Sequence, residues 1–211
     1  MKARTTKLPT LPDYLEPGLD LVFVGINPGL YSAQQGHYFA RSTNRFWPAF
    51  TASRLSRRIR DGLSVERLAP EDDGTLLRFG IGFTDVVKRA SGNAAELDPA
   101  DFALWAPRLL KKLGRVAPRV ACFHGLTAYR PFLALALGID DRGPVLGPQP
   151  ELVGSTRLFV VPNPSPANAH FTLADQTAWY DRLADFLDAC RGGGSPVVAP
   201  APTRSEPGER S

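Results

Sequence analysis

Cysteine and histidine are scarce in this sequence, with two cysteines and three histidines among 211 residues. The pair Cys122 and Cys190 provides no disulfide framework of the kind that stabilises small secreted domains. Cys122 lies in an apolar segment, where we expect a buried thiol. Because the cysteines and histidines show no metal-ligand spacing, the sequence predicts no metal site, and nothing in it implies an organic cofactor.

Long hydrophobic runs are also absent. No segment is apolar over the length that spans a bilayer, and the first residues show no signal-peptide pattern, so we expect a cytoplasmic protein without membrane contact. The hydrophobic share of 43% is enough for the core of one domain, and the net charge of +4 permits a polyanionic partner. Five clustered arginines are either contacts for that partner or a solvated helix face: Arg54, Arg57, Arg58, Arg60 and Arg67.

The two ends of the chain differ in composition from its middle. Residues 1–12 carry basic side chains without an apolar period and predict a basic flexible arm. Residues 191–211 begin with glycines and continue with proline, alanine and charges, which is typical of a disordered, low-complexity tail. Residues 13–190 remain as a single domain.

Strand-like and helix-like segments alternate within that domain. Strands are expected at 21–24, 119–123 and 157–161, with weaker candidates at 81–83 and 151–153. Helices are expected at 44–59 with a kink at Pro48, and at 71–79, 99–113, 125–137 and 173–190. We expect Ser42 or Thr43 to cap the first helix, and Asp98 to cap the helix that begins at Pro99. This alternation predicts an α/β fold, a three-layer αβα sandwich with a central, mostly parallel sheet.

The segment Leu21–Gly29 is the most informative part of the sequence. Its four apolar residues indicate a strand buried on both faces, and Pro28 and the glycines then end that strand. Asn27 is thereby placed just beyond the carboxyl end of a buried strand, where open α/β sheets bind their ligands. The alternative is a plain turn with Asn27 in a tight bend.

A specific resemblance rests on several motifs in order. Gly25-Ile-Asn-Pro-Gly29, Gly36-His-Tyr-Phe-Ala40 and Asn44-Arg-Phe-Trp47 resemble the mismatch-specific uracil/thymine-DNA glycosylases, the Mug/TDG branch of the uracil-DNA glycosylase superfamily. Two later motifs, at residues 80–84 and 161–165, fall where that family has its own, and the resemblance covers about residues 18–187. It implies the same three-layer fold.

The resemblance also implies roles for residues around Asn27. Asn27 aligns with the water-positioning asparagine and Phe39 with the aromatic platform for a flipped base, with Tyr38 as its neighbour. Ile26 and Tyr31 are expected to line the pocket, and backbone groups of Ile26 and Phe39 to contact the uracil edge. The alternative for Phe39 is that it only anchors its loop in the core, and His37 has no evident partner.

Asp85 departs from the family pattern, which has lysine or asparagine at this position. An amide such as Asn27 does not titrate near neutral pH, whereas a carboxylate can accept a proton from water or stabilise a cationic sugar. Asp85 is therefore a catalytic candidate beside Asn27. The alternatives are a cap for residues 86–89 or an ion pair with Lys88 or Arg89.

The remaining candidates are expected to contact DNA. Asn44 opens a helix whose N–H groups can hold a phosphate. The resemblance implies that the loop 163–170 enters the minor groove of DNA. Ser165 and Asn168 can form hydrogen bonds with phosphates. Relatives carry a bulky Leu or Arg in this loop, but this chain does not, which leaves His170 as a substitute. The loop candidates are Asn163, Ser165, Pro166, Ala167 and Asn168.

The resemblance and these residues together imply a monomeric, monofunctional glycosylase that removes uracil from mismatched DNA, with thymine and damaged pyrimidines as further candidate substrates. The expected partner is double-stranded DNA with a flipped uracil, extending to single-stranded DNA. One alternative is a non-catalytic member of the same fold that only binds nucleic acid. Another, a small-molecule hydrolase, lacks a Gly-x-Ser-x-Gly elbow.

Overall fold

A five-stranded sheet forms the centre of the computed structural model, which describes residues 10–139 and 143–192. Its strands are β1 (Leu21–Gly25), β2 (Ile81–Asp85), β3 (Val120–His124), β4 (Gly147–Val153) and β5 (Thr156–Val161). They lie in the order β2-β1-β3-β5-β4, with β4 antiparallel to β5 and the other pairs parallel. The predicted α/β fold with a mostly parallel sheet is confirmed.

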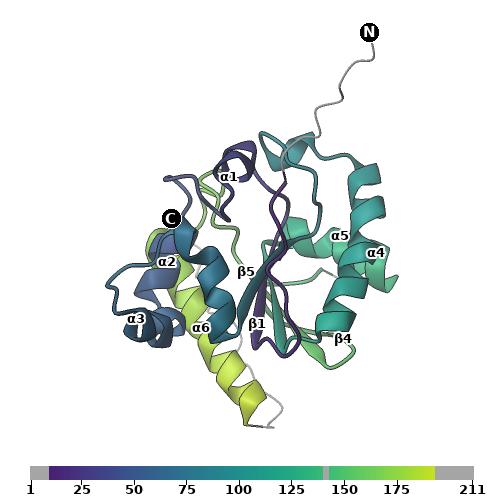
Figure 1. Ribbon diagram of the computed structural model, residues 1–211. Helices are drawn as coiled ribbons and strands as arrows, with labels where there is room; N and C mark the ends of the chain where they lie inside the picture. The colour runs from purple at the N-terminus through teal and green to yellow at the C-terminus, as the bar shows by residue number, and fades with distance from the viewer. Residues whose placement is uncertain (1–9, 140–142, 193–211) are drawn as a thin grey trace, which may run out of the picture.

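Helices cover both faces of this sheet (Figure 1). On one side lie α2 (Phe46–Ala52), α3 (Arg57–Leu63) and α6 (Leu173–Arg191), and on the other lie α4 (Pro99–Val116) and α5 (Leu126–Leu137). A short helix, α1 (Leu30–Gln35), follows β1. Three 3-10 segments complete the elements: η1 (Arg54–Ser56), η2 (Pro70–Phe79) and η3 (Ala94–Glu96).

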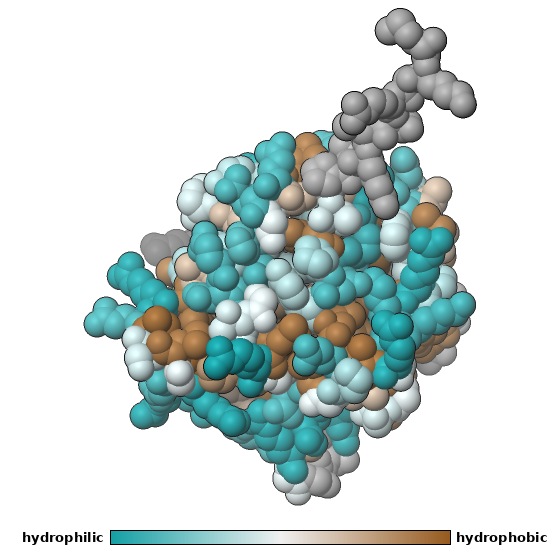
Figure 2. Space-filling model, viewed as in Figure 1, coloured by the Kyte–Doolittle hydropathy of each residue, from teal (hydrophilic) through white to brown (hydrophobic). Residues whose placement is uncertain are grey.

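The sheet separates two hydrophobic cores because its strands alternate their side chains between the two faces. Phe23 and Cys122 face the first core, towards α2 and α6, whereas Val24 and Phe123 face the second, towards α4 and α5. Cys122 is fully buried, as expected. On the face seen in Figure 2, hydrophobic residues form separate patches between hydrophilic ones.

The predicted helix 44–59 is wrong in its details. The chain breaks at Ser53, whose backbone is extended, rather than at Pro48. Pro48 is the third residue of α2, where its missing N–H costs nothing. Ser53 Oγ instead donates to the Phe50 carbonyl (2.8 Å), the kind of local bond by which serine competes with a helix. Neither Ser42 nor Thr43 caps α2, because Asn44 Oδ1 accepts from the Phe46 N–H (2.9 Å).

Other predicted segments hold with shifted ends. Residues 70–79 form a 3-10 rather than an α-helix, and α4 begins at Pro99 after an extended Asp98, as predicted. The weak strand at 151–153 is the end of β4, an edge strand with a register shift between Pro148 and Leu152. Prolines are compatible with an edge strand, which lacks a partner on one side.

The first described residues are packed against the domain. Leu11 is 2% exposed in the first core, and Thr10 Oγ1 donates to the Lys88 carbonyl (2.7 Å). Tyr14 forms an antiparallel bridge with Phe83 of β2. Thr10 to Pro12 therefore belong with the domain rather than with the predicted flexible arm. The rest of that arm, residues 1–9, and the tail from 193 lie outside the described residues, in which no helix is long and apolar enough to cross a membrane.

Candidate active site

The candidate active site lies at the carboxyl end of the sheet, on the face that packs against α2 and α6. Here β2 ends in Asp85, β1 in Gly25 and β3 in His124, and the register places Gly25 beside Asp85. Because residue 25 is a glycine, no side chain separates Asp85 of β2 from His124 of β3. Ligands of open parallel sheets bind beyond this end of the strands, so the fold favours a site here.

Asp85 bends over the backbone of Gly25. A Cβ atom on Gly25 would lie 2.5 Å from Asp85 Oδ1, which is closer than a side chain tolerates. Glycine at this position is what lets the carboxylate lie where it does. Asp85 is only 3% exposed, and its second oxygen, Oδ2, lies 3.4 Å from Lys88 Nζ. The predicted pairing with Lys88 is thus present, whereas Arg89 pairs with Asp101 instead (2.6 Å).

Lys88 is shared between two carboxylates. Its Nζ lies 3.0 Å from Asp13 Oδ1 and 3.2 Å from the Tyr38 hydroxyl, in addition to Asp85. Burial raises the pKa of Asp85 to about 6, although Lys88 opposes that shift. Burial also disfavours the Asp13 carboxylate, but Lys88 and Lys112 together lower its pKa below the usual value. Asp85 therefore changes charge near neutral pH while Asp13 stays ionised.

The carboxamide of Asn27 is held in one orientation. Its Nδ2 donates to the carbonyls of Arg89 (3.0 Å) and Pro28 (3.2 Å) and to Ser91 Oγ (2.8 Å). A carbonyl oxygen can only accept, so Nδ2 must face the segment after β2 and Oδ1 must face away from it. In the part of the chain that the structure describes, Oδ1 accepts no hydrogen bond, and the residue is half-buried. The acceptor needed to orient a water is therefore free.

Phe39 has a rigid ring and a strained backbone. The ring stacks on Phe46, with ring centroids 4.3 Å apart and planes at 17°. It also packs against the ring of His124 in an edge-type contact, with ring centroids 5.0 Å apart. Its φ of 55° is unusual for a residue other than glycine. The amides on either side are anchored, Tyr38 N–H to Asp73 and Ala40 N–H to Ser32, while the Phe39 N–H has no acceptor among the described residues. One ring face is thus covered, and a backbone donor stays free.

The neighbours of Phe39 and Asn27 occupy different environments. Tyr38 is 1% exposed and its hydroxyl donates to the Pro12 carbonyl, so its ring belongs to the core. Ile26 is also buried, whereas Tyr31 lies on α1 and is 44% exposed. His37 has a partner after all, because its Nδ1 lies 3.2 Å from a carboxylate oxygen of Asp73.

The loop 163–171 follows β5 and is shaped by its own side chains. Asn163 Oδ1 accepts from the Ser165 N–H (2.9 Å), and Asn168 Nδ2 donates to the Asn163 carbonyl (3.0 Å). Both asparagine side chains are therefore used inside the loop. Pro166 and Ala167 are exposed. From residue 163 to 169 no side chain long enough to reach across a DNA duplex is present.

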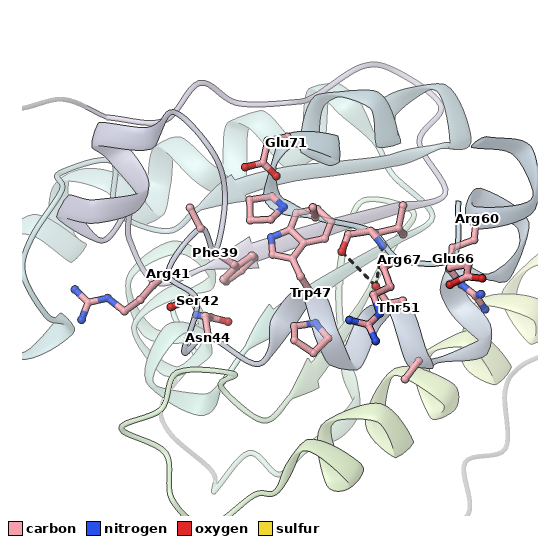
Figure 3. A pocket seen from close by; sticks show the side chains of 16 residues that line it. Phe39, Arg41, Ser42, Asn44, Trp47, Thr51, Arg60, Glu66, Arg67 and Glu71 are labelled. Carbon is pink, nitrogen blue, oxygen red and sulfur yellow. Dashed lines mark hydrogen bonds between the residues drawn. The ribbon is translucent and has the colours of Figure 1, made fainter. Parts of the chain in front are cut away.

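An open groove of about 840 Å³ begins at Phe39 and runs along α2 (Figure 3). Arg41 points away from Phe39 and Trp47, while Arg60, Arg67 and Glu66 gather at the other end of the groove. These mixed charges select no single class of ligand. The arginines of 54–58 lie elsewhere, beside Asp20 and Ile81 at the amino ends of β1 and β2, and Arg54 pairs with Asp185.

Sequence reasoning missed two residues near this site. His124 is 1% exposed, its Nε2 lies 3.1 Å from the Tyr180 hydroxyl, and its Nδ1 has no hydrogen-bond partner among the described residues. Burial lowers the pKa of His124 to about 3, against the opposing effect of the Val24 backbone, so the imidazole is neutral. Arg45 lies in a motif noted above and contacts the loop 163–171. Only the apolar strand before His124 could have indicated its burial.

Comparisons with known proteins give a family and a fold. A family model of the uracil DNA glycosylase superfamily matches residues 12–187. Among solved structures, the chain is similar to the solution NMR structure of "a putative Uracil DNA glycosylase from Methanosarcina acetivorans". The TM-score is 0.51 at 20% identity, covering 86% of this chain and 98% of that chain. At this identity the likeness shows the fold. In the described residues no group of three or more His, Cys, Asp or Glu side chains could hold a metal ion.

Proposed function

The chain belongs to the uracil-DNA glycosylase superfamily, and from that premise we propose that it is a monofunctional, mismatch-specific enzyme of the Mug/TDG type. It hydrolyses the N-glycosidic bond of uracil in mismatched double-stranded DNA and leaves an abasic site. The observation that carries the proposal is the locked carboxamide of Asn27, whose free Oδ1 faces away from its anchors. Thymine and damaged pyrimidines are further substrates of the same site.

In the proposed mechanism the uracil nucleotide leaves the base stack and its base enters the site beside Phe39. Flipping costs a few kcal/mol, least for mispaired bases, and the ring face of Phe39 not covered by Phe46 contributes stacking. The Phe39 N–H offers a donor to the edge of the base. Asn27 Oδ1 accepts a hydrogen bond from the attacking water, and Asp85 takes up its proton or stabilises the cationic sugar.

The test is an assay with a labelled duplex that contains one uracil, incubated with the protein and then heated in alkali. Strand cleavage after heating supports a glycosylase, because alkali breaks the chain at an abasic site. A shifted band on a native gel without cleavage would instead favour a protein that only binds nucleic acid.

Phe39→Leu should weaken capture of the flipped base. Leucine keeps an apolar contact with Phe46 and His124 but removes the aromatic face, so the expected cost is about 1–3 kcal/mol, or roughly 5- to 150-fold in half-saturating substrate. Excision by Phe39→Leu and Phe39→Tyr is compared with wild type over a range of duplex concentrations. Phe39→Tyr is the matched control and should bind like wild type. Equal capture by the leucine variant would mean that Phe39 only packs in the core.

The loop composition predicts weak discrimination of the opposite base. Because no long side chain extends from residues 163–169, we expect a small preference for G·U over A·U and measurable excision from single strands. Ala167→Arg should strengthen duplex binding and sharpen the preference. All three substrates are compared at one salt concentration, since phosphate contacts depend on salt. Ala178→Arg on α6 controls for the added charge. A wild-type enzyme confined to G·U duplexes would contradict the prediction.

A further inference from the structure

Arg45 makes an unusual set of contacts with the loop 163–171. Its guanidinium donates to four backbone carbonyls: Ser165 (2.5 Å), Asn168 (2.7 Å), Phe171 (2.7 Å) and Pro164 (3.4 Å). Its own N–H donates to the Pro164 carbonyl as well (3.1 Å). One side chain at the start of α2 thus holds a loop some 120 residues further along the chain.

These contacts leave the charge of Arg45 without an acidic partner. No carboxylate lies within ion-pair distance of the guanidinium among the described residues, so its charge is balanced only by carbonyl dipoles. Arginine suits this role because its planar fork presents five N–H donors in fixed directions, and lysine cannot reproduce that geometry. The positive charge remains beneath the loop.

The same contacts fix the direction of the loop backbone. Carbonyls of four residues turn inward to Arg45, and the N–H groups of Ala169, His170 and Phe171 have no acceptor in the described part of the chain. Ala169 and His170 are exposed. Free backbone N–H groups in a loop that also holds a positive charge are suited to phosphate oxygens, which accept many of the hydrogen bonds between proteins and DNA.

We propose that Arg45 is a positioning residue that holds the backbone of the loop 163–171 in the shape that contacts the sugar–phosphate backbone of duplex DNA. The inference rests on the proposed function, because it concerns how that enzyme engages its substrate. It also accounts for a loop without long side chains: the loop contacts the duplex through its main chain, whose order depends on Arg45. A single strand lacks the second strand that the loop meets and depends less on this order.

The experiment compares Arg45→Lys and Arg45→Gln with wild type on G·U duplex and on single-stranded uracil DNA. We expect the half-saturating duplex concentration to rise about tenfold or more, because several hydrogen bonds to a charged group are lost, while kcat on duplex and excision from single strands change little. Arg41→Gln is the matched control. Arg41 is an exposed arginine close by in the chain, its side chain makes no hydrogen bond among the described residues, and its loss removes the same charge.

A second measurement is independent of catalysis. Amide hydrogen exchange over residues 163–171 should quicken in both Arg45 variants and stay unchanged in Arg41→Gln, since the Asn168 N–H to Ser165 bond belongs to the loop that Arg45 holds. Equal losses on duplex and single strands, or unchanged exchange in the loop, would overturn the inference. If the wild type cleaves neither substrate, the proposed function fails, and loop exchange with binding to an uncleaved duplex still decides the role of Arg45.

Discussion

Asn27→Ala should lower the single-turnover rate of uracil excision by about 10²-fold or more while leaving duplex binding nearly unchanged. The side chain acts by holding a water, and a misplacement of about 1 Å at a reacting centre can cost 10²-fold. Loss of one hydrogen-bond partner of Asn27 Nδ2 should have a smaller effect than loss of Asn27 itself. Ser91→Ala removes one acceptor but leaves the Arg89 carbonyl, so we expect a smaller loss of excision rate.

The measurement is single-turnover cleavage with enzyme in excess, with binding followed separately on an uncleaved duplex. Gln34→Ala is the control, because Gln34 on α1 is an exposed carboxamide whose side chain makes no hydrogen bond among the described residues. If Asn27→Ala cleaves at the wild-type rate, Asn27 does not position the attacking water. A loss of binding equal to the loss of rate would make Asn27 a binding residue.

Asp85→Asn should lower the excision rate by about 10²–10⁴-fold, the usual range for a lost general base. With a pKa of about 6, the wild-type rate should fall about tenfold per pH unit below pH 6, as the carboxylate takes up a proton. That acidic limb should disappear in Asp85→Asn. The charged or titratable groups around Asp85 are Lys88, Asp13 and Tyr38. The pKa of Asp13 is lowered below its usual value and burial raises the pKa of Tyr38 well above its own, so neither accounts for a limb near pH 6.

Asp85→Asn should also raise stability, which separates catalysis from a structural role. The folded pKa of about 6 exceeds the usual aspartate value of 3.8, so the contribution of Asp85 to stability is fully present below pH 3.8 and is lost as pH rises through 6. At pH 7 the neutral amide should therefore stabilise the fold, by up to about 3 kcal/mol. Lys88 keeps its contact with Asp13 (3.0 Å) in the variant.

Thermal unfolding at pH 7 and the rate–pH profile are measured together, with Asp61→Asn, an exposed carboxylate on α3, as control. A destabilised variant with wild-type activity would identify Asp85 as a structural partner of Lys88.

Local sequence signals predicted most of the sheet, because each buried strand is a short apolar run that ends in a turn. Residues 21–24 and 157–161 lie in strands for this reason. Helix α1 was not predicted, because six residues are too few to show a helical period. The break at Ser53 was not predicted either, because it depends on a side-chain hydrogen bond that hydrophobic periodicity does not reveal. The weaker strand candidate at 81–83 lies inside β2, which ends at Asp85, and its partner Lys88 is three residues further along the chain.

Contacts between distant segments could not be predicted from one sequence. Asp13 reaches Lys88 and Lys112 only because Tyr14 pairs with β2, and Arg45 meets its loop only once α2 and β5 have packed. His124 follows the same rule, since its burial depends on aromatic rings from three other segments. Pattern reasoning identifies residues that follow a strand, whereas the partners that set their charge and orientation come from the folded arrangement.

The close approach of Asp85 to Gly25 has a consequence for engineering this site. A Cβ atom at position 25 would lie 2.5 Å from Asp85 Oδ1, so Gly25→Ala would push the carboxylate out of the place that it now occupies. A smaller side chain at position 85 would leave room for the added methyl group. A mutant library that varies position 25 should therefore vary position 85 together with it.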